Sequence, residues 1–93
     1  MQQFVYMPCV YILLSLKMKM TYTGSSHGDE PTSRIKLHNS GKVQSTKFGV
    51  PWQLIHEEQY ADYTEARKRE LFLKTGRGRA IVKQLVEKSL SER

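Results

Sequence analysis

The feature that most constrains the fold is a short apolar run near the start of the chain, residues 9–16, with the sequence CVYILLSL. The run is bounded by Pro8 and Lys17, and it is too short and too uniformly apolar for an amphipathic surface helix. Such a run favours a strand that other parts of the protein cover on both faces. We therefore expect residues 9–16 to form a buried strand.

The same region argues against a targeting or membrane segment. The apolar stretch over residues 4–16 is interrupted by Pro8 and is shorter than the roughly 20 residues that a membrane-spanning helix needs. It also lacks the preceding basic residue that is typical of a signal peptide. With 93 residues, the chain has room for one small domain. We expect a leader at residues 1–8, the domain at 9–90, a tail at 91–93 and a cytoplasmic location.

Periodicity and turn residues predict the element order β-β-α-β-α-α. Alternation over residues 18–23 is typical of a half-buried strand, which we expect to pair with the first strand as an antiparallel hairpin turning at residues 16–18. Together with a third strand, this hairpin predicts an α+β domain, a three-stranded antiparallel sheet flanked by helices. The other expected elements are a Gly/Ser-rich loop at 24–29, a helix at 31–39, an exposed basic loop at 42–50, a strand at 52–56, a helix to about residue 74, a break at 75–78 and an amphipathic helix through 81–90.

Three local signals set the expected helix boundaries. Pro31 follows two acidic residues at 29–30, which is typical of a helix start, and Gly41 supplies a stop for that helix. Asp62 and Glu65 have the spacing of a capping box, which predicts that the next helix begins just after Asp62.

The charge of the chain indicates a polyanionic partner. Fifteen Lys and Arg side chains stand against nine Asp and Glu, for a net charge of +6, which favours nucleic acid first and an anionic membrane second. Glu87 and Glu92 in the last helix argue against the membrane. A single cysteine excludes a disulfide framework and a Cys-rich zinc site.

Glu70 is the first residue that does not fit a purely structural role. In a helix it lies on the same face as Tyr63, Ala66 and Leu73, where a carboxylate is costly unless it meets a cation, a donor or a metal. The alternative is an ordinary ion pair with Lys74, four residues later.

Two further pairs share the same ambiguity. Arg34 and His38 are four residues apart, so they share a helix face and together suit a phosphate, or else form a solvated surface. Tyr11 and Tyr22 lie in neighbouring strands, where the hairpin brings their phenols to one site, or else they are core residues.

Taken in order, these residues resemble the GIY-YIG nuclease domain in its compact, stand-alone bacterial form. The resemblance covers about residues 10–85 and implies the same α+β fold. Its first two motifs stand at Val10-Tyr11-Ile12 and Tyr22-Thr23-Gly24, eleven residues apart from tyrosine to tyrosine. Three more blocks follow in order, at residues 33–41, 51–54 and 65–70.

The chain departs from the family pattern at a few positions. Val10 and Thr23 replace the usual residues of the two tyrosine motifs, and Ser33 stands where a basic residue is frequent. The segment from Gly24 to Arg34 is also about two residues longer than usual. These departures leave both tyrosines in place and bear mainly on where Arg34 lies.

The resemblance implies a metal-dependent phosphodiesterase. The resemblance implies that Glu70 holds one divalent ion, Mg²⁺ or Mn²⁺, and that Arg34 stabilises the charge that develops on the phosphate. Tyr11 is the general base, with His38 as the alternative, and Tyr22 and His38 orient water and phosphate. Five basic residues are expected to contact the nucleic-acid backbone, or else to be solvated surface: Lys42, Lys47, Lys74, Arg77 and Arg79.

The implied substrate is DNA, with RNA as the alternative, and no small molecule. Because the chain has no residues left for an added DNA-binding domain, we expect an endonuclease that prefers single-stranded or structured DNA, with little sequence specificity, in repair or recombination. Two alternatives stay open: a nucleic-acid-binding module with weak or no turnover, and a nuclease domain that is active only with a protein partner. The partner would pack on the apolar face of the last helix, which otherwise covers the protein's own core: Ile81, Val82, Leu85, Val86 and Leu90.

Overall fold

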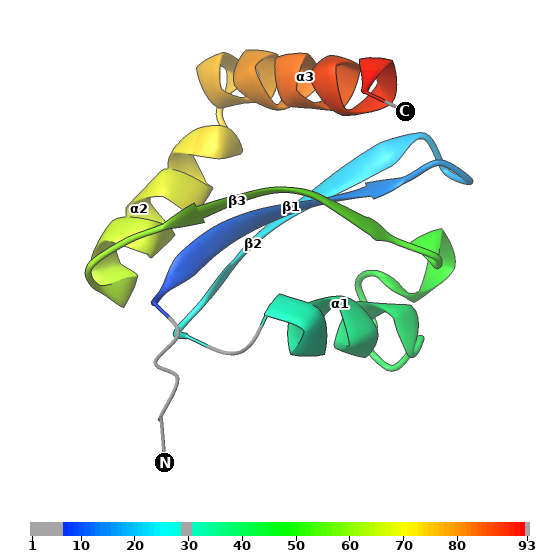
Figure 1. Ribbon diagram of the computed structural model, residues 1–93, viewed down its shortest axis with the longest axis horizontal. Helices are drawn as coiled ribbons and strands as arrows, with labels where there is room; N and C mark the ends of the chain where they lie inside the picture. Colours follow the sequence, from blue (N-terminus) through cyan, green and yellow to red (C-terminus); the bar gives the residue numbers. More distant parts are fainter. Residues whose placement is uncertain (1–6, 29–30, 93) are drawn as a thin grey trace.

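The structure is a computed structural model that describes residues 7–28 and 31–92 (Figure 1). It confirms the α+β class and the order β-β-α-β-α-α. The expectations for most of the leader, for the acidic residues at 29–30 and for residue 93 lie outside the described residues. The elements are β1 (Cys9–Ser15), β2 (Met20–Ser26), α1 (Pro31–Asn39), a short 3-10 helix η1 (Lys47–Gly49), β3 (Gln53–Gln59), α2 (Tyr63–Leu73) and α3 (Gly76–Ser91).

The sheet places β1 at its centre. The strand order is β2-β1-β3, and β1 runs antiparallel to both neighbours. Helices α2 and α3 lie over one face of the sheet and α1 lies over the other (Figure 1). Every residue of β1 is buried, which confirms the prediction from its apolar sequence.

Successive side chains of β1 point into two different cores. Val10 and Ile12 pack with residues of α2 and α3, including Leu73. Tyr11 and Leu13 face the opposite side, where they pack with Trp52. Tyr11 therefore lies on the α1 side of the sheet.

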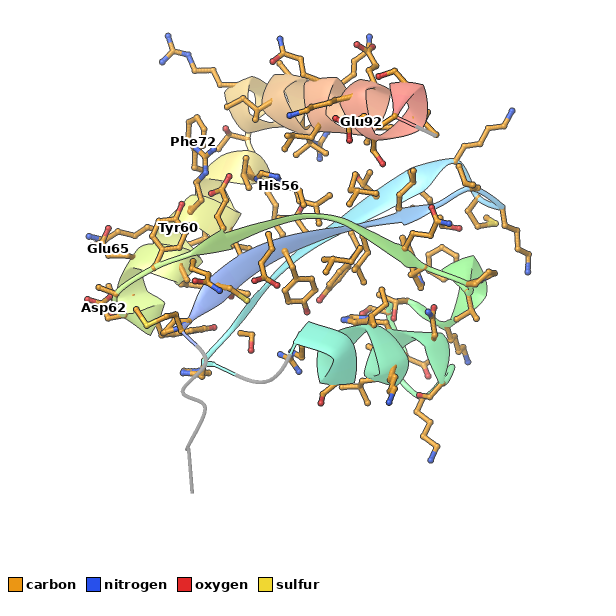
Figure 2. All side chains as sticks on the ribbon, in the orientation of Figure 1. His56, Tyr60, Asp62, Glu65, Phe72 and Glu92 are labelled. Carbon is orange, nitrogen blue, oxygen red and sulfur yellow. The ribbon has the colours of Figure 1, made fainter. Side chains whose placement is uncertain are left out.

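An ion cluster around Glu58 ties β3 to α2. Glu58 accepts hydrogen bonds from Arg69 Nε on α2 at 2.9 Å and from the Tyr60 hydroxyl at 2.7 Å, and it contacts His56 at 2.8 Å. Burial by itself raises the pKa of Glu58, but these hydrogen bonds outweigh it and lower the pKa to about 2. Figure 2 labels His56 in β3 and Tyr60 just after the end of that strand. This contact fixes the position of α2 against the sheet.

The hairpin differs from the prediction in its boundaries. The first strand ends at Ser15, the turn covers residues 16–19, and β2 covers Met20–Ser26 rather than residues 18–23. Gly24, Ser25 and Ser26 were expected in a loop, but they pair with Tyr11, Val10 and Cys9 of β1. The sequence signal was wrong here because pairing with a buried strand outweighs the low strand propensity of glycine and serine.

Two other predictions are corrected on the β3 side. The third strand covers Gln53–Gln59, so it begins one residue later and ends three residues later than predicted. The 42–50 segment is not simply an exposed loop, because Thr46 and Gly49 within it are buried. Trp52 covers this segment, and its indole N–H donates to the Thr46 carbonyl at 2.8 Å.

The glycines at 76 and 78 do not separate the last two helices as widely as predicted. Helix α3 already begins at Gly76, and Thr75 caps it by accepting a hydrogen bond from the Gly78 N–H. A Cβ on Gly78 would lie 2.1 Å from the Phe72 carbonyl oxygen, so only glycine allows α3 to start this close to the end of α2.

Most of the apolar face of α3 covers the protein's own core. This was one of the two expectations for that face, the other being a contact with a protein partner. Val82 is buried, and Ile81, Leu85 and Val86 pack against the same cluster. Leu90 is 44% exposed. Within the described part of the chain, no helix is long and apolar enough to cross a membrane.

Candidate active site

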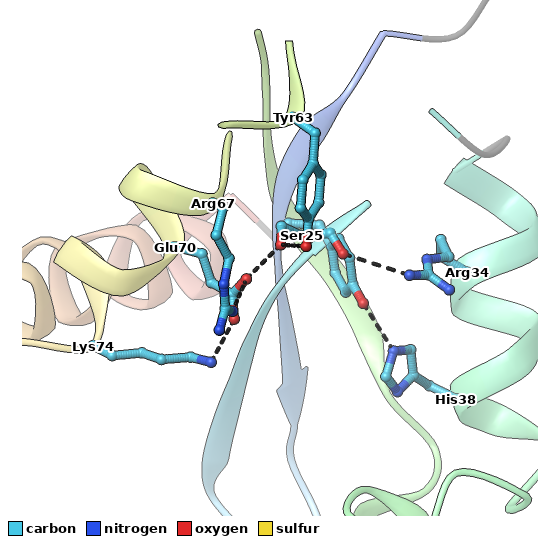
Figure 3. Close-up of polar contacts among 8 residues, drawn as sticks. Ser25, Arg34, His38, Tyr63, Arg67, Glu70 and Lys74 are labelled. Carbon is cyan, nitrogen blue, oxygen red and sulfur yellow. Dashed lines mark hydrogen bonds and ion pairs between the residues drawn. The ribbon is translucent and has the colours of Figure 1, made fainter. Parts of the chain in front are cut away.

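The candidate site is built around Ser25, near the end of the edge strand β2. Its backbone carbonyl accepts a hydrogen bond from Arg34 Nη2 at 3.5 Å, and its side-chain hydroxyl donates to the Glu70 carboxylate. Figure 3 shows Arg34 and Glu70 approaching Ser25 from opposite sides, one from α1 and one from α2. Because β2 is an edge strand, groups on both faces of the sheet meet at its rim.

A chain of hydrogen-bonding groups leads from Tyr11 into the protein. The Tyr11 hydroxyl lies 3.1 Å from His38 Nε2, and His38 Nδ1 lies 3.0 Å from the Thr46 hydroxyl. His38 is 3% exposed, so the alternative of a solvated helix face is wrong for this residue. A neutral imidazole has one N–H and one acceptor nitrogen, so a phenol that donates to Nε2 leaves Nδ1–H to donate to Thr46.

The surroundings keep the Tyr11 phenol and the His38 imidazole uncharged at neutral pH. Burial, followed by the nearby Tyr22, raises the pKa of the Tyr11 phenol well above its ordinary value, while Arg34 lowers it only partly. Burial and the positive charge of Arg34 lower the pKa of His38 below 6.5. At neutral pH the pair is therefore a protonated phenol beside a neutral imidazole, which is a proton acceptor.

Tyr22 completes an aromatic cluster on the α1 side of the sheet. Its ring centroid lies 6.2 Å from that of Tyr11 and 4.9 Å from that of His38. The hairpin therefore brings the two rings together, and both also belong to the core on this side of the sheet, as the alternative expected. The Arg34 Cζ lies 5.9 Å from the centroid of the Tyr11 ring. Arg34 and His38 thus approach the same tyrosine, in agreement with the helix face that their spacing predicted them to share.

Glu70 is buried on the other side of β2, at 4% exposed. It shares the buried face of α2 with Ala66 and Leu73, as predicted. The alternative ion pair also forms, since Lys74 Nζ lies 2.5 Å and Arg67 Nη1 lies 2.8 Å from its carboxylate oxygens. Burial by itself raises the pKa of Glu70, but hydrogen bonds from these cations and from Ser25 outweigh it and lower the pKa. The group is therefore ionised at neutral pH.

The donors around Glu70 are of the kind that hard cations bind. One carboxylate, the Ser25 hydroxyl and the Tyr63 hydroxyl lie together, with the two hydroxyl oxygens 3.3 Å apart. The described residues contain no cluster of three or more His, Cys, Asp or Glu. Oxygen donors with a single carboxylate fit Mg²⁺ or Mn²⁺, whose remaining positions are filled by water and substrate, and do not fit a closed structural zinc site.

This geometry agrees with a comparison against protein families. The family sequence model that describes the GIY-YIG catalytic domain matches residues 7–82, which is most of the chain. The chain belongs to the GIY-YIG family. Members of this family are nuclease-type domains that act on nucleic acid and generally depend on a divalent metal ion.

Two curated relatives of this GIY-YIG domain come from Staphylococcus epidermidis. The UPF0213 protein SERP0126 of strain RP62A is 38% identical over 55 residues, which are 58% of this chain and 65% of that protein. A UPF0213 protein of strain ATCC 12228 matches with the same identity and coverage. The chain thus spans slightly less than two thirds of the length of these relatives. No solved structure matches it significantly.

The basic residues predicted to contact nucleic acid do not form one patch in this GIY-YIG domain. Lys74 lies at Glu70, and Arg77 and Arg79 are exposed in the first turn of α3. Lys42 and Lys47 are exposed in the connection that follows α1, on the other side of the sheet (Figure 1).

Sequence reasoning missed several residues that build the site. Ser25 had a usable signal, because it directly follows the second tyrosine motif and a longer strand would have pointed its side chain toward α2. The role of Tyr63 depends on its contact with Ser25, 38 residues away, which its place on the Glu70 face does not reveal. Arg67 had a usable signal, because it lies three residues before Glu70 on the same helix, whereas Thr46 carried none.

Gly24 is needed because Tyr11 lies directly across it. The two residues are paired between β1 and β2, and a Cβ on Gly24 would lie 2.7 Å from the Tyr11 hydroxyl oxygen and 2.9 Å from the Tyr22 ring. A side chain at this position would therefore displace both phenols of the site.

We predict that Gly24→Ala lowers any cleavage activity by at least about tenfold and destabilises the fold by about 1–3 kcal/mol, the usual cost of overpacking. Thermal unfolding and cleavage assays measure the two effects. Gly76→Ala is the matched control, because a Cβ there meets nothing within 4 Å. An active Gly24→Ala protein would show that the position of Tyr11 is unimportant.

Proposed function

We propose that this protein is a metal-dependent endonuclease that hydrolyses phosphodiester bonds in DNA, with a preference for single-stranded or structured DNA and little sequence specificity. The proposal places it in DNA repair or recombination, in the cytoplasm. The observation that carries it is the convergence at Ser25, whose carbonyl accepts from Arg34 and whose hydroxyl donates to Glu70. In this proposal the Arg34 guanidinium binds the phosphate and the Glu70 carboxylate binds the metal, beside the Tyr11–His38 pair.

In this proposal, Glu70 would hold the divalent ion. A bound Mg²⁺ or Mn²⁺ neutralises charge on the phosphate and lowers the pKa of coordinated water. Lys74 and Arg67 neutralise the Glu70 carboxylate in the structure described here, and both cations are about half exposed while Glu70 is buried. A divalent ion at Glu70 would take over this neutralisation of a buried charge.

Tyr11 and His38 would handle the proton of the attacking water. Because the Tyr11 phenol is protonated at rest, it cannot act as a ready phenolate. It passes its own proton to His38 Nε2, 3.1 Å away, while its oxygen takes a proton from the water. Tyr22 lies against both rings and fixes their orientation.

Arg34 would bind the phosphate and stabilise the charge that develops on it. We predict that Arg34→Ala lowers the rate of cleavage of single-stranded and branched DNA by about 10²-fold, the usual effect of losing one such donor. Arg34→Lys should recover only part of the rate, because lysine keeps the charge but loses the planar fork. The assay is run with Mg²⁺ or Mn²⁺ and repeated with a chelator.

Lys36→Ala is the matched control for Arg34, since it removes an exposed charge from the same helix. We expect it to change the rate by less than about twofold, as for most exposed charges. Equal, chelator-insensitive cutting by the wild type and Arg34→Ala would contradict the proposed function.

One observation favours a second candidate function, a nucleic-acid-binding module with weak or no turnover. Both carboxylate oxygens of Glu70 are already engaged, by Lys74 at 2.5 Å and by Arg67 at 2.8 Å. DNA binding that persists without metal-dependent cleavage would support this candidate instead. A requirement for an added protein would indicate a nuclease domain that works only with a partner.

A further inference from the structure

A groove lies between the β1–β2 hairpin and helix α3, and most of its lining residues have no part in the proposed reaction. Its volume is about 590 Å³, within the usual range for ligand sites. The hairpin contributes residues 19–23, and α3 contributes Arg79, Val82, Lys83 and Val86. Lys74, whose ammonium group contacts Glu70, also lines the groove, so the groove adjoins the candidate active site.

The walls of this groove are strongly basic. Lys19 on the hairpin, Lys74 at the end of α2, and Arg79 and Lys83 on α3 all line it, and no carboxylate appears among the described residues that do. A second copy of this chain, with its net charge of +6, is electrostatically unsuited to such a surface. The charge favours a polyanion instead.

The floor of the groove is apolar. Leu14, Leu73, Val82 and Val86 form it, and Met20 at its edge is 40% exposed. A duplex presents phosphates on its outside and stacks its base faces inside, so it would leave this floor uncovered. An unpaired strand offers both chemistries, since its phosphates match the cationic walls and its bases bury apolar surface against the aliphatic floor.

We propose that the groove between the hairpin and α3 binds a single nucleic-acid strand that continues from the active site. This inference rests on the proposed function, in which Glu70 marks the active site. It adds Lys19 and Lys83 to the residues that are proposed to contact the substrate. It accounts for the proposed preference for unpaired strands through residues of this domain.

Fluorescence anisotropy tests the proposal without cleavage. Labelled single strands of about 12 nucleotides, within the usual site size, are titrated in chelator as DNA, as RNA, as a duplex and as an abasic strand of equal charge. We expect the wild type to bind the single strand about tenfold more tightly than the abasic strand, because the abasic strand buries no base against the apolar floor. Tight binding of either DNA or RNA fits the groove, and the comparison tells which of them it prefers.

The double variant Arg79→Ala/Lys83→Ala should weaken single-strand binding about tenfold and reduce the salt slope by about 1.4, which is 0.7 for each lost phosphate contact. The matched control, Lys68→Ala/Lys88→Ala, removes two exposed charges outside the groove and should shift the affinity by less than about twofold. Equal losses in the two double variants, or equal binding of duplex, abasic and intact strands, would overturn the proposal.

The two proposals can fail separately. A protein that binds single strands through the groove but cleaves nothing in Mg²⁺ keeps the groove and loses the nuclease function. A protein that cleaves normally while Arg79→Ala/Lys83→Ala binds like the wild type loses only the groove.

Discussion

Glu70→Gln is expected to lower metal-dependent DNA cleavage by about 10³-fold or more, the largest effect of any single substitution in this protein. The carboxylate is the one acidic group at the Ser25 convergence among the described residues, so its amide would not hold a divalent ion there. Loss of a catalytic metal removes several kcal/mol of transition-state stabilisation, which corresponds to this change in rate. Single-turnover cleavage over a range of Mg²⁺ and Mn²⁺ concentrations measures it.

The fold should survive this substitution. Lys74 and Arg67 lose a charged partner, but both are about half exposed and can be solvated instead, so the loss arises mainly at the buried side chain of residue 70 and should be about 1–3 kcal/mol. DNA affinity should be unchanged or higher, because a negative charge near the phosphate has been removed. Glu65→Gln, at an exposed position on the same helix, is the matched control and should cleave like the wild type. Cleavage by Glu70→Gln within tenfold of the wild type would eliminate the metal-binding role.

How much of the fold could be predicted depends on how local each signal is. The apolar sequence of β1 reveals its burial because every side chain in it is covered. The last residues of β2 could not be recognised in the same way, since Gly24 and Ser25 are typical turn residues. They form a strand only because they pair along their whole length with β1, and neither segment alone reveals this pairing.

The boundary between α2 and α3 illustrates the same limit. A threonine followed by two glycines normally predicts a break, and Thr75 does lie between the two helices as the cap of α3. The glycines nevertheless belong to α3, because Gly78 must pass within a few ångströms of the Phe72 carbonyl. A glycine that is required for close packing looks the same in sequence as one that ends a helix.

Some residues of the candidate site could be predicted from sequence, and others could not. The spacing of Arg34 and His38, and the position of Glu70 on an apolar helix face, were enough to predict which way these side chains point. Ser25 and Thr46 were missed because serine and threonine are common in polar segments, and their partners lie 45 and 8 residues away in the chain. Site residues with unusual placement can be found from sequence, whereas those that support them need the register of the sheet.

The second large effect is expected at the start of the proton path. Tyr11→Phe should lower the cleavage rate by about 10³-fold, within the range for loss of a general base, while its ring keeps its packing over Gly24. Tyr60→Phe is the matched control, because it removes a phenol that bonds Glu58 away from the site. Cleavage by Tyr11→Phe at the wild-type rate would mean that the water is activated elsewhere.

The pH profile separates the role of His38 from simple packing. His38 accepts the Tyr11 proton only when it is neutral, and burial and Arg34 lower its pKa below 6.5. The imidazole is therefore neutral and competent above that lowered pKa, and it becomes charged as the pH falls through it. Wild-type cleavage should decline toward acid with a midpoint below pH 6.5. His38→Gln should be slower and should lose this acid limb, whereas a slower variant that kept the wild-type profile would show that His38 only supports Tyr11 structurally.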